Sequence, residues 1–195
     1  MNMAKAKLKP VVAPEPVKID LGCGKNKQAG FIGVDQYQMD GVDVVCDLAS
    51  SRWPWDDESV SEVHCSHFLE HLTNLGGKWE RVHFFNELGR VLKADGKVTL
   101  ILPHWASNRY YGDPTHKEPF SEMGFYYLSR EWRLSQAPHA DASVNPNGYS
   151  CDLGAVWGYA VNPSLSSRNA EYQQYAMQWY KEAITDIHAT ITKKS

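Results

Sequence analysis

The chain has 195 residues, of which 43% are hydrophobic and 22% are charged, as in an ordinary globular domain. Its formal net charge of −3 gives no basis for bulk electrostatic attraction to nucleic acid or to an anionic membrane. The four cysteines lack CxxC spacing, and there is no membrane-spanning apolar run or signal-peptide core. We therefore expect free thiols, no membrane partner and a cytoplasmic location.

Three short apolar segments open the chain after a tail rich in Lys, Ala and Pro. The tail, residues 1–16, is predicted to be flexible and to precede a single domain over residues 17–195. The apolar segments lie at about 17–21, 31–35 and 42–47, and each has an acidic residue at its last or next-to-last position. They are typical of neighbouring strands in an open α/β sheet.

A glycine turn directly follows the first strand, in the run Asp20-Leu21-Gly22-Cys23-Gly24. Such a turn lets a nucleoside-bearing ligand approach the backbone, and Asp35 at the end of the second strand can accept hydrogen bonds from ribose hydroxyls. Lys27 stands where a dinucleotide-binding pattern has its third glycine, which argues against a nicotinamide enzyme. Only residues 25–30 separate the turn from the next strand, so the first helix is expected to be shortened to a turn or absent.

The next segments continue the alternation of strand and helix. A strand is predicted at 60–66, a helix with one apolar face at 79–92, and a strand at 97–102 that Pro103 ends. This alternation predicts parallel pairing with right-handed crossovers. The loss of the first helix leaves one face of the sheet in need of cover, which we expect the N-terminal segment or the second half to supply.

The second half, residues 104–195, is richer in loops and aromatic side chains. A short helix is predicted near 121–130, a strand at 153–161, a helix at 167–183 and a period-two strand at 186–192.

An ordered series of short motifs over residues 17–103 resembles the cofactor-binding half of class I S-adenosylmethionine-dependent methyltransferases of the small-molecule type. The series is Asp20-Leu21-Gly22-Cys23-Gly24, Gly33-Val34-Asp35, Cys46-Asp47-Leu48, Trp53-Pro54-Trp55-Asp56-Asp57, Ser66-His67-Phe68-Leu69-Glu70-His71-Leu72, Glu87-Leu88-Gly89-Arg90-Val91-Leu92-Lys93 and Gly96-Lys97. The resemblance implies an enzyme with a Rossmann-like three-layer α/β sandwich, a mostly parallel seven-stranded sheet, an antiparallel last strand and helices on both faces. Residues 104–195 would form the acceptor side.

The resemblance also implies S-adenosylmethionine as the cofactor and assigns its contacts. Gly22 and Gly24 would lie beneath the methionine and ribose parts, and Asp20 would contact the amino group. Asp47 with the Leu48 backbone would face the adenine. The implied cofactor-binding residues are Asp20, Leu21, Gly22, Cys23, Gly24, Asp35, Asp47, Leu48, Ser66 and His67. A plain turn or cap role stays open for Asp47, and a helix-cap or packing role stays open for Ser66 and His67.

Methyl transfer is an in-line displacement that needs a base only when the acceptor carries a proton at neutral pH. Candidate catalytic residues follow the fifth strand: His104, Asp113 and His116, with His116 preferred because it lies in a Pro-containing polar loop. The expected acceptor is a small molecule or a glycan. A duplex nucleic acid is not expected, because Cys65-Ser66-His67 stands where amino-methylating DNA enzymes carry an Asp- or Asn-Pro-Pro-aromatic sequence. The sequence leaves the oligomeric state open.

Two other functions stay open. One is an adenosylmethionine-binding subunit or sensor without transfer activity. The other is a zinc-dependent hydrolase, because His67, Glu70 and His71 match the H-x-x-E-H pattern of inverted zinc peptidases. That pattern needs a distant third ligand that the sequence does not identify, and it overlaps the Glu-His-Leu sequence of the methyltransferases. We therefore expect no metal.

Overall fold

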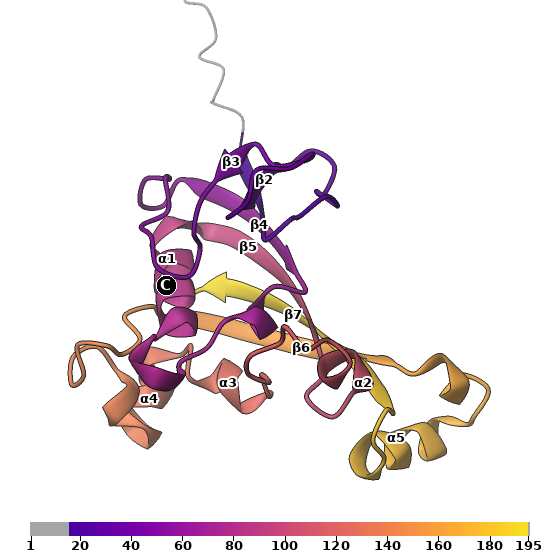
Figure 1. Ribbon diagram of the computed structural model, residues 1–195. Helices are drawn as coiled ribbons and strands as arrows, with labels where there is room; N and C mark the ends of the chain where they lie inside the picture. Colours follow the sequence, from indigo (N-terminus) through magenta and orange to yellow (C-terminus); the bar gives the residue numbers. More distant parts are fainter. Residues whose placement is uncertain (1–15, 195) are drawn as a thin grey trace, which may run out of the picture.

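The computed structural model describes residues 16–194, so that residues 1–15 and 195, including nearly all of the predicted tail, lie outside the described part. One seven-stranded sheet with the order β3-β2-β1-β4-β5-β7-β6 organises the chain (Figure 1). Its strands are β1 (Val17–Leu21), β2 (Ile32–Asp35), β3 (Val44–Val45), β4 (Val60–Ser66), β5 (Leu92–Pro103), β6 (Leu153–Val161) and β7 (Ile184–Lys193). Only β7 is reversed in direction: its pairs with β5 and β6 are antiparallel, and all other pairs in this sheet are parallel. The expected mostly parallel sheet with an antiparallel last strand is thus confirmed.

The helices are few and mostly short. They are α1 (Glu80–Val91), α2 (Asn108–Tyr111), α3 (Met123–Tyr126), α4 (Arg130–Gln136) and α5 (Ala170–Trp179), with 3₁₀ turns η1 (Leu69–His71), η2 (Leu75–Gly77), η3 (Pro138–Ala140) and η4 (Pro163–Leu165). The α5 helix is shorter than predicted at both ends: Asn169 caps its start, accepting a hydrogen bond from Tyr172 N, and the backbone becomes extended at Tyr180. Within residues 16–194, no helix has both the length and the apolar character needed to cross a membrane.

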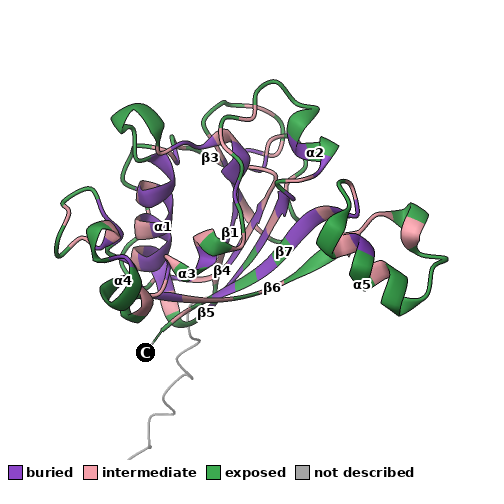
Figure 2. Ribbon diagram, turned by 90° about the horizontal axis from the view of Figure 1, so that it is seen from below, coloured by how far each residue is buried: buried purple, intermediate pink, exposed green. Residues whose placement is uncertain are grey.

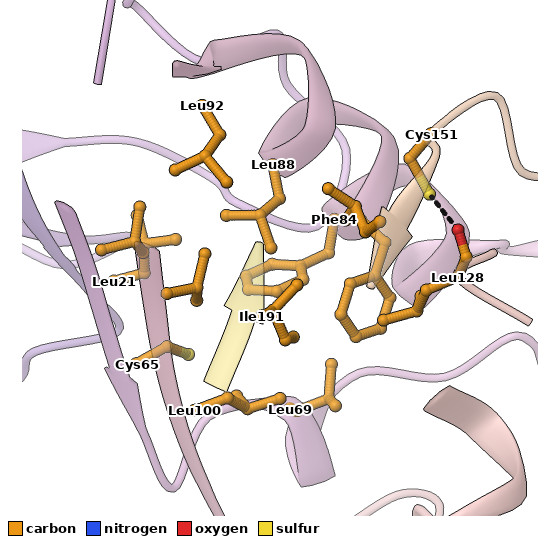
Figure 3. Packing of buried hydrophobic residues seen from close by; sticks show 14 of the residues in the cluster. Leu21, Cys65, Leu69, Phe84, Leu88, Leu92, Leu100, Leu128, Cys151 and Ile191 are labelled. Carbon is orange, nitrogen blue, oxygen red and sulfur yellow. Dashed lines mark hydrogen bonds between the residues drawn. The ribbon is translucent and has the colours of Figure 1, made fainter. Parts of the chain in front are cut away.

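Helix α1 packs against one face of the sheet and forms the centre of the core. Its apolar side chains recur every three residues, so they make one stripe along the helix. Figure 3 shows Phe84 and Leu88 of this helix lying over Cys65 and Leu100 of the central strands. On β5 and β7 the paired buried residues Leu100 and Ala189 belong to the same face.

The aromatic second half extends the same layer. Phe85 of α1 contacts Phe120, with ring centroids 6.1 Å apart. Phe125 of α3 stacks on Trp157 of β6, with centroids 5.1 Å apart. The expectation that this half covers the opposite face is therefore wrong, because its large side chains complete the layer that α1 begins. The alternative cover, the N-terminal segment, lies almost entirely outside the described residues. Figure 2 shows the buried residues along α1 and the central strands, whereas α5 is mostly exposed.

The opposite face of the sheet is polar and open at its β5–β7 part. Thr99 pairs with Thr190, the alternate position Lys97 pairs with Thr192, and all four residues are exposed. Within residues 16–194, no second layer of helices covers this face of β5 and β7. This arrangement follows from the period-two alternation of β5 and β7, which places apolar side chains on one face only.

The β1–β2 loop, residues 22–31, takes the place of the first helix. It contains no helix, in agreement with the expectation from its length. Phe31 at its end lies edge-on to His64, with ring centroids 6.3 Å apart, and the Lys18 ammonium lies over the same ring. This loop covers the part of the polar face that β1 and β4 form, next to the carboxyl ends of those strands.

Candidate active site

The glycine turn lies where the carboxyl ends of β1, β2 and β4 meet. Gly22 and Gly24 both have positive φ, +66° and +51°, a conformation that disfavours side chains. The backbone N–H groups of Gly22 and Cys23 both donate to Val34 O, at 2.9 and 3.1 Å, which ties the turn to β2. A methyl group at Gly22 would overlap the Phe68 ring, whereas the same position at Gly24 faces open space. Gly24 is therefore the place where a ligand can approach the backbone.

One cavity is lined by this turn, and a second is lined in part by Phe68, whose ring packs against Gly22. The larger, of about 360 Å³, is called the glycine-turn cavity, and it is lined by Asp20, Gly22, Cys23, Gly24, Lys25, Asn26, His64, Ser66 and His67. The smaller, of about 70 Å³, is lined by Gln36, Cys46, Asp47, Leu48, Ala49, Phe68, His71, Leu72 and Lys117. Eight of the ten predicted cofactor residues therefore line one or the other of these two cavities. Leu21 and Asp35 line neither: the Leu21 side chain is fully buried in the core, and Asp35 is half-buried.

The acidic residue of the first strand is committed to the structure of the turn. Asp20 is buried, its Oδ2 accepts a hydrogen bond from Gln28 N at 2.7 Å, and its Oδ1 lies 2.7 Å from His64 Nδ1. These bonds hold the short β1–β2 loop against β4. Burial raises the pKa of the neighbouring Cys23 thiol, which keeps that side chain neutral at neutral pH.

The acidic residues after β2 and β3 also have local partners. Asp35 Oδ2 accepts from Gly24 N at 3.1 Å, and its Oδ1 accepts from Tyr37 N at 3.1 Å. Asp47 accepts from Ala49 N and from Ser50 Oγ, and the Ser50 hydrogen bond holds the pKa of Asp47 below its ordinary value. The turn role that the sequence left open for Asp47 is thus formed, and the residue still borders the smaller cavity.

A second group of polar side chains lies beyond the end of β4, and we call it the His–Glu cluster: His67, Glu70, His71 and His116. His67 has φ of +53° at the end of β4, and its Nδ1 lies 3.4 Å from Glu70 Oε1. The His116 side chain is only 8% exposed, and its Nε2 lies 3.8 Å from Glu70 Oε1. The rings of His71 and His116 meet edge to face, with centroids 4.8 Å apart.

The loop after α2 brings His116 into this cluster. Lys117 N donates to Glu70 O at 2.9 Å, which docks the loop on η1. Thr115 donates to Asp113 Oδ1 through its N–H and its hydroxyl, so the loop is held in a tight turn. Asp113 Oδ2 lies 3.8 Å from His116 Nε2. Two of the three predicted catalytic residues, His116 and Asp113, therefore lie together at the site.

The third, His104, belongs to another cluster. It is buried, its Nδ1 accepts from Ala106 N at 3.2 Å, and its Nε2 lies 3.3 Å from Glu122 Oε1. Burial acts to raise the pKa of Glu122, but the hydrogen bond to His104 outweighs it with other polar contacts and lowers that pKa to about 2. Both ring nitrogens of His104 therefore have structural partners.

Asp186 and Arg109 also lie at this edge of the sheet, and neither was predicted as a site residue. Asp186 of β7 is buried, and its Oδ1 lies 3.8 Å from His67 Nε2. Its Oδ2 lies 3.1 Å from Arg109 Nη1. Asp186 sits in a strand with ordinary alternation, so no local pattern could have marked it. Glu70 and His71 entered only through the zinc hydrolase alternative. The helical turn that would align His67 with His71 is not formed, because η1 is a three-residue 3₁₀ turn and His67 lies outside it.

No protein-family model and no curated protein matches the sequence. Solved structures do match. A SAM-dependent methyltransferase from Archaeoglobus fulgidus superposes with a TM-score of 0.58 at 18% identity, over 92% of this chain and 86% of that one. The YcgJ protein from Bacillus subtilis gives 0.51 at 16% identity over 93% of each chain. Geranyl diphosphate C-methyltransferase from Streptomyces coelicolor, crystallised with Mg²⁺, geranyl diphosphate and S-adenosyl-L-homocysteine, gives 0.51 at 15% identity over 93% and 73%. At such identities the likeness shows the fold, which is the Rossmann-like fold that the motif series implies.

Proposed function

We propose that the protein is an S-adenosylmethionine-dependent methyltransferase that acts on a small molecule or glycan. The observation that carries the proposal is the position of the predicted cofactor residues. Eight of ten line one of two cavities at the carboxyl edge of the sheet, which is where open α/β sheets bind nucleotide-like ligands. The shared fold with solved methyltransferases supports the same conclusion.

The glycine-turn cavity would hold the methionine part of the cofactor. Gly24 gives the ligand an open stretch of backbone, and Ser66 and His67 at the end of β4 would lie near the transferred methyl group. Asp35 would bind the ribose, because each of its carboxylate oxygens accepts only one backbone hydrogen bond and can accept another. The smaller cavity, with Asp47 and Leu48, would border the adenine.

The His–Glu cluster would handle the acceptor. His116 Nδ1 lies 2.6 Å from Tyr110 O, so this nitrogen must carry the proton and donate to the carbonyl. The Nε2 atom therefore keeps its lone pair, which suits it to receive a proton from an acceptor hydroxyl or ammonium. Asp113 would orient the ring or bind a cationic acceptor. His104 has both nitrogens occupied, so of the three candidates it has the least freedom to act as a base.

The methyl-transfer step needs no activation of the leaving group by the protein. The sulfonium supplies a neutral leaving group, so alignment of donor and acceptor can account for much of the rate, up to ~7–11 kcal/mol in favourable cases. A geranyl diphosphate enzyme with the same fold shows that this architecture can serve a small-molecule acceptor.

The test uses the purified full chain. Calorimetry measures binding of S-adenosylmethionine and S-adenosylhomocysteine. A second assay measures the release of S-adenosylhomocysteine with a panel of hydroxyl, amine and glycan acceptors. We expect binding of both ligands and release with at least one acceptor class. His116→Asn should lower the rate of methyl transfer about 10²–10⁴-fold and leave the affinity for S-adenosylhomocysteine unchanged, whereas the exposed control His188→Ala should match the parent in both.

Absence of binding would overturn the proposal. Binding without release across the whole panel would favour the inactive subunit or sensor instead.

A further inference from the structure

Three potential metal ligands converge beside the glycine-turn cavity. Glu70, His71 and His116 each offer a ligand atom, and these atoms lie within 4.8 Å of one another. We propose that they bind a divalent transition-metal ion, such as Zn²⁺. The H-x-x-E-H pattern contains Glu70 and His71 but pairs them with His67, whereas His116 lies 45 residues beyond His71 and belongs to no such pattern.

The Glu70 carboxylate is buried and lacks hydrogen-bond partners within residues 16–194. Its residue is only 1% exposed, and neither of its oxygens has a hydrogen-bond partner among the residues that the structure describes. A buried carboxylate without partners is costly, so buried charges in proteins are as a rule paired or bound to metals. Ring nitrogens of His67 and His116 lie 3.4 and 3.8 Å from Oε1. A cation between the carboxylate and the imidazoles would satisfy both.

The two histidines have the outer partners that metal-binding histidines usually have. His116 Nδ1 faces Tyr110 O at 2.6 Å, and His71 Nδ1 faces Thr115 O at 3.3 Å. A carbonyl oxygen can only accept, so each Nδ1 carries its hydrogen and each Nε2 keeps the lone pair that a metal needs. Because the loop is docked by Lys117 N on Glu70 O, these positions are held without the ion.

The ligand set indicates the kind of ion. Two imidazoles and one carboxylate suit Zn²⁺, Co²⁺, Mn²⁺ or Fe²⁺, whereas Mg²⁺ and Ca²⁺ prefer sites made of oxygen atoms. Three protein ligands leave at least one position open, as in catalytic rather than structural zinc sites. That chemistry suits an exogenous oxygen ligand.

The place of the site suggests what that oxygen ligand is, and this step rests on the proposed methyltransferase function. His67 lines the glycine-turn cavity and also lies 3.4 Å from Glu70, so the site is one side chain away from the expected methyl donor. We infer an acceptor that binds the ion through a hydroxyl oxygen. The ion would lower the pKa of that hydroxyl, and its proton would leave to solvent. The oxygen–methyl bond then forms as the methyl–sulfur bond breaks, and the thioether leaves as a neutral molecule. His116 would act as a metal ligand and no longer as a free base.

The experiment titrates the chelator-treated full chain with Zn²⁺ and Co²⁺, and with Mg²⁺ as the comparison ion. We expect one Zn²⁺ per chain by elemental analysis after gel filtration, visible absorption bands for Co²⁺, and no binding of Mg²⁺ at the same concentration. Glu70→Gln and His71→Ala should each weaken Zn²⁺ binding by at least about tenfold. The control His188→Ala, an exposed histidine on the open face of the sheet, should not.

A second readout separates ligand loss from misfolding. Without metal, Glu70→Gln should be at least as stable to heat as the parent, because it removes an unpaired buried charge. Failure of the parent to bind Zn²⁺ stoichiometrically, or binding that survives in both ligand variants, would overturn the site. Calorimetry with S-adenosylhomocysteine runs in parallel. Zinc binding without S-adenosylhomocysteine binding would overturn the proposed function and leave the metal site standing. S-adenosylhomocysteine binding without zinc binding would overturn the metal site and leave the proposed function standing.

Discussion

Replacement of Asp35 by alanine tests the cofactor site most directly. The carboxylate accepts one backbone N–H on each oxygen, from Gly24 and Tyr37, and it is half-buried at the end of β2. If ribose hydroxyls use the remaining lone pairs, Asp35→Ala removes charge-assisted hydrogen bonds worth roughly 1–3 kcal/mol in a partly solvated site. That loss corresponds to an affinity for S-adenosylhomocysteine that is about 5- to 150-fold weaker.

Calorimetric titration of S-adenosylhomocysteine into the parent and three variants measures this effect. Asp35→Asn keeps one acceptor oxygen and should lose less affinity than Asp35→Ala. Asp95→Ala, at an exposed position of β5, should match the parent. Chemical denaturation should show that the free energy of unfolding falls by less than about 1 kcal/mol in Asp35→Ala, because water can replace the acceptor at the exposed Tyr37. A folded Asp35→Ala protein with the affinity of the parent would refute the ribose assignment.

Three further predictions concern stability. The pKa of Glu122 is lowered to about 2 from an ordinary 4.5. Its contribution to the free energy of unfolding, at most about 3 kcal/mol, is therefore present above pH 4.5 and is lost as the pH falls toward 2. Glu122→Gln should flatten the loss of unfolding free energy between pH 5 and 3, and an unchanged acid slope would contradict this. Gly22→Ala should destabilise more than Gly24→Ala: both incur the left-handed backbone cost of ~1–2 kcal/mol, but only Gly22 meets an aromatic ring. Equal denaturation midpoints would argue against that difference. Arg133 is fully buried with an aspartate and three carbonyl partners, so Arg133→Met should cost about 3–5 kcal/mol, against less than about 0.5 kcal/mol for the exposed Arg130→Met, as thermal unfolding can measure.

The part of the site that the sequence predicts is the part built from adjacent residues. The glycine turn follows a strand directly, and the acids that end β1 and β2 reach the same sheet edge because parallel strands share it. The short spacing at residues 25–30 predicted the missing helix for the same local reason. Such features depend on chain geometry over a few residues, so they can be deduced without tertiary contacts.

The acceptor side could not be predicted in this way. The contact between Glu70 and His116 depends on the docking of a loop through Lys117 N, which no periodicity encodes. Asp186 reaches the site only because β7 inserts beside β5. The open face has a local signal, because the alternation at Lys97 and Thr99 indicates a polar face. The expectation that this face would be covered followed the usual form of the fold instead of that alternation. The division of the chain into cofactor and acceptor halves stays a prediction.

The position of β7 has a consequence for how the chain folds. It is the only strand of the sheet that pairs with β6, yet it is synthesised after β6 and after the α5 segment that separates them. Until residues 184–193 leave the ribosome, β6 has no ladder partner and β5 presents an unpaired edge. We expect the β1–β5 part to order first and the second half to join in one late step. Chains released before β7 is complete should therefore be prone to edge-to-edge aggregation.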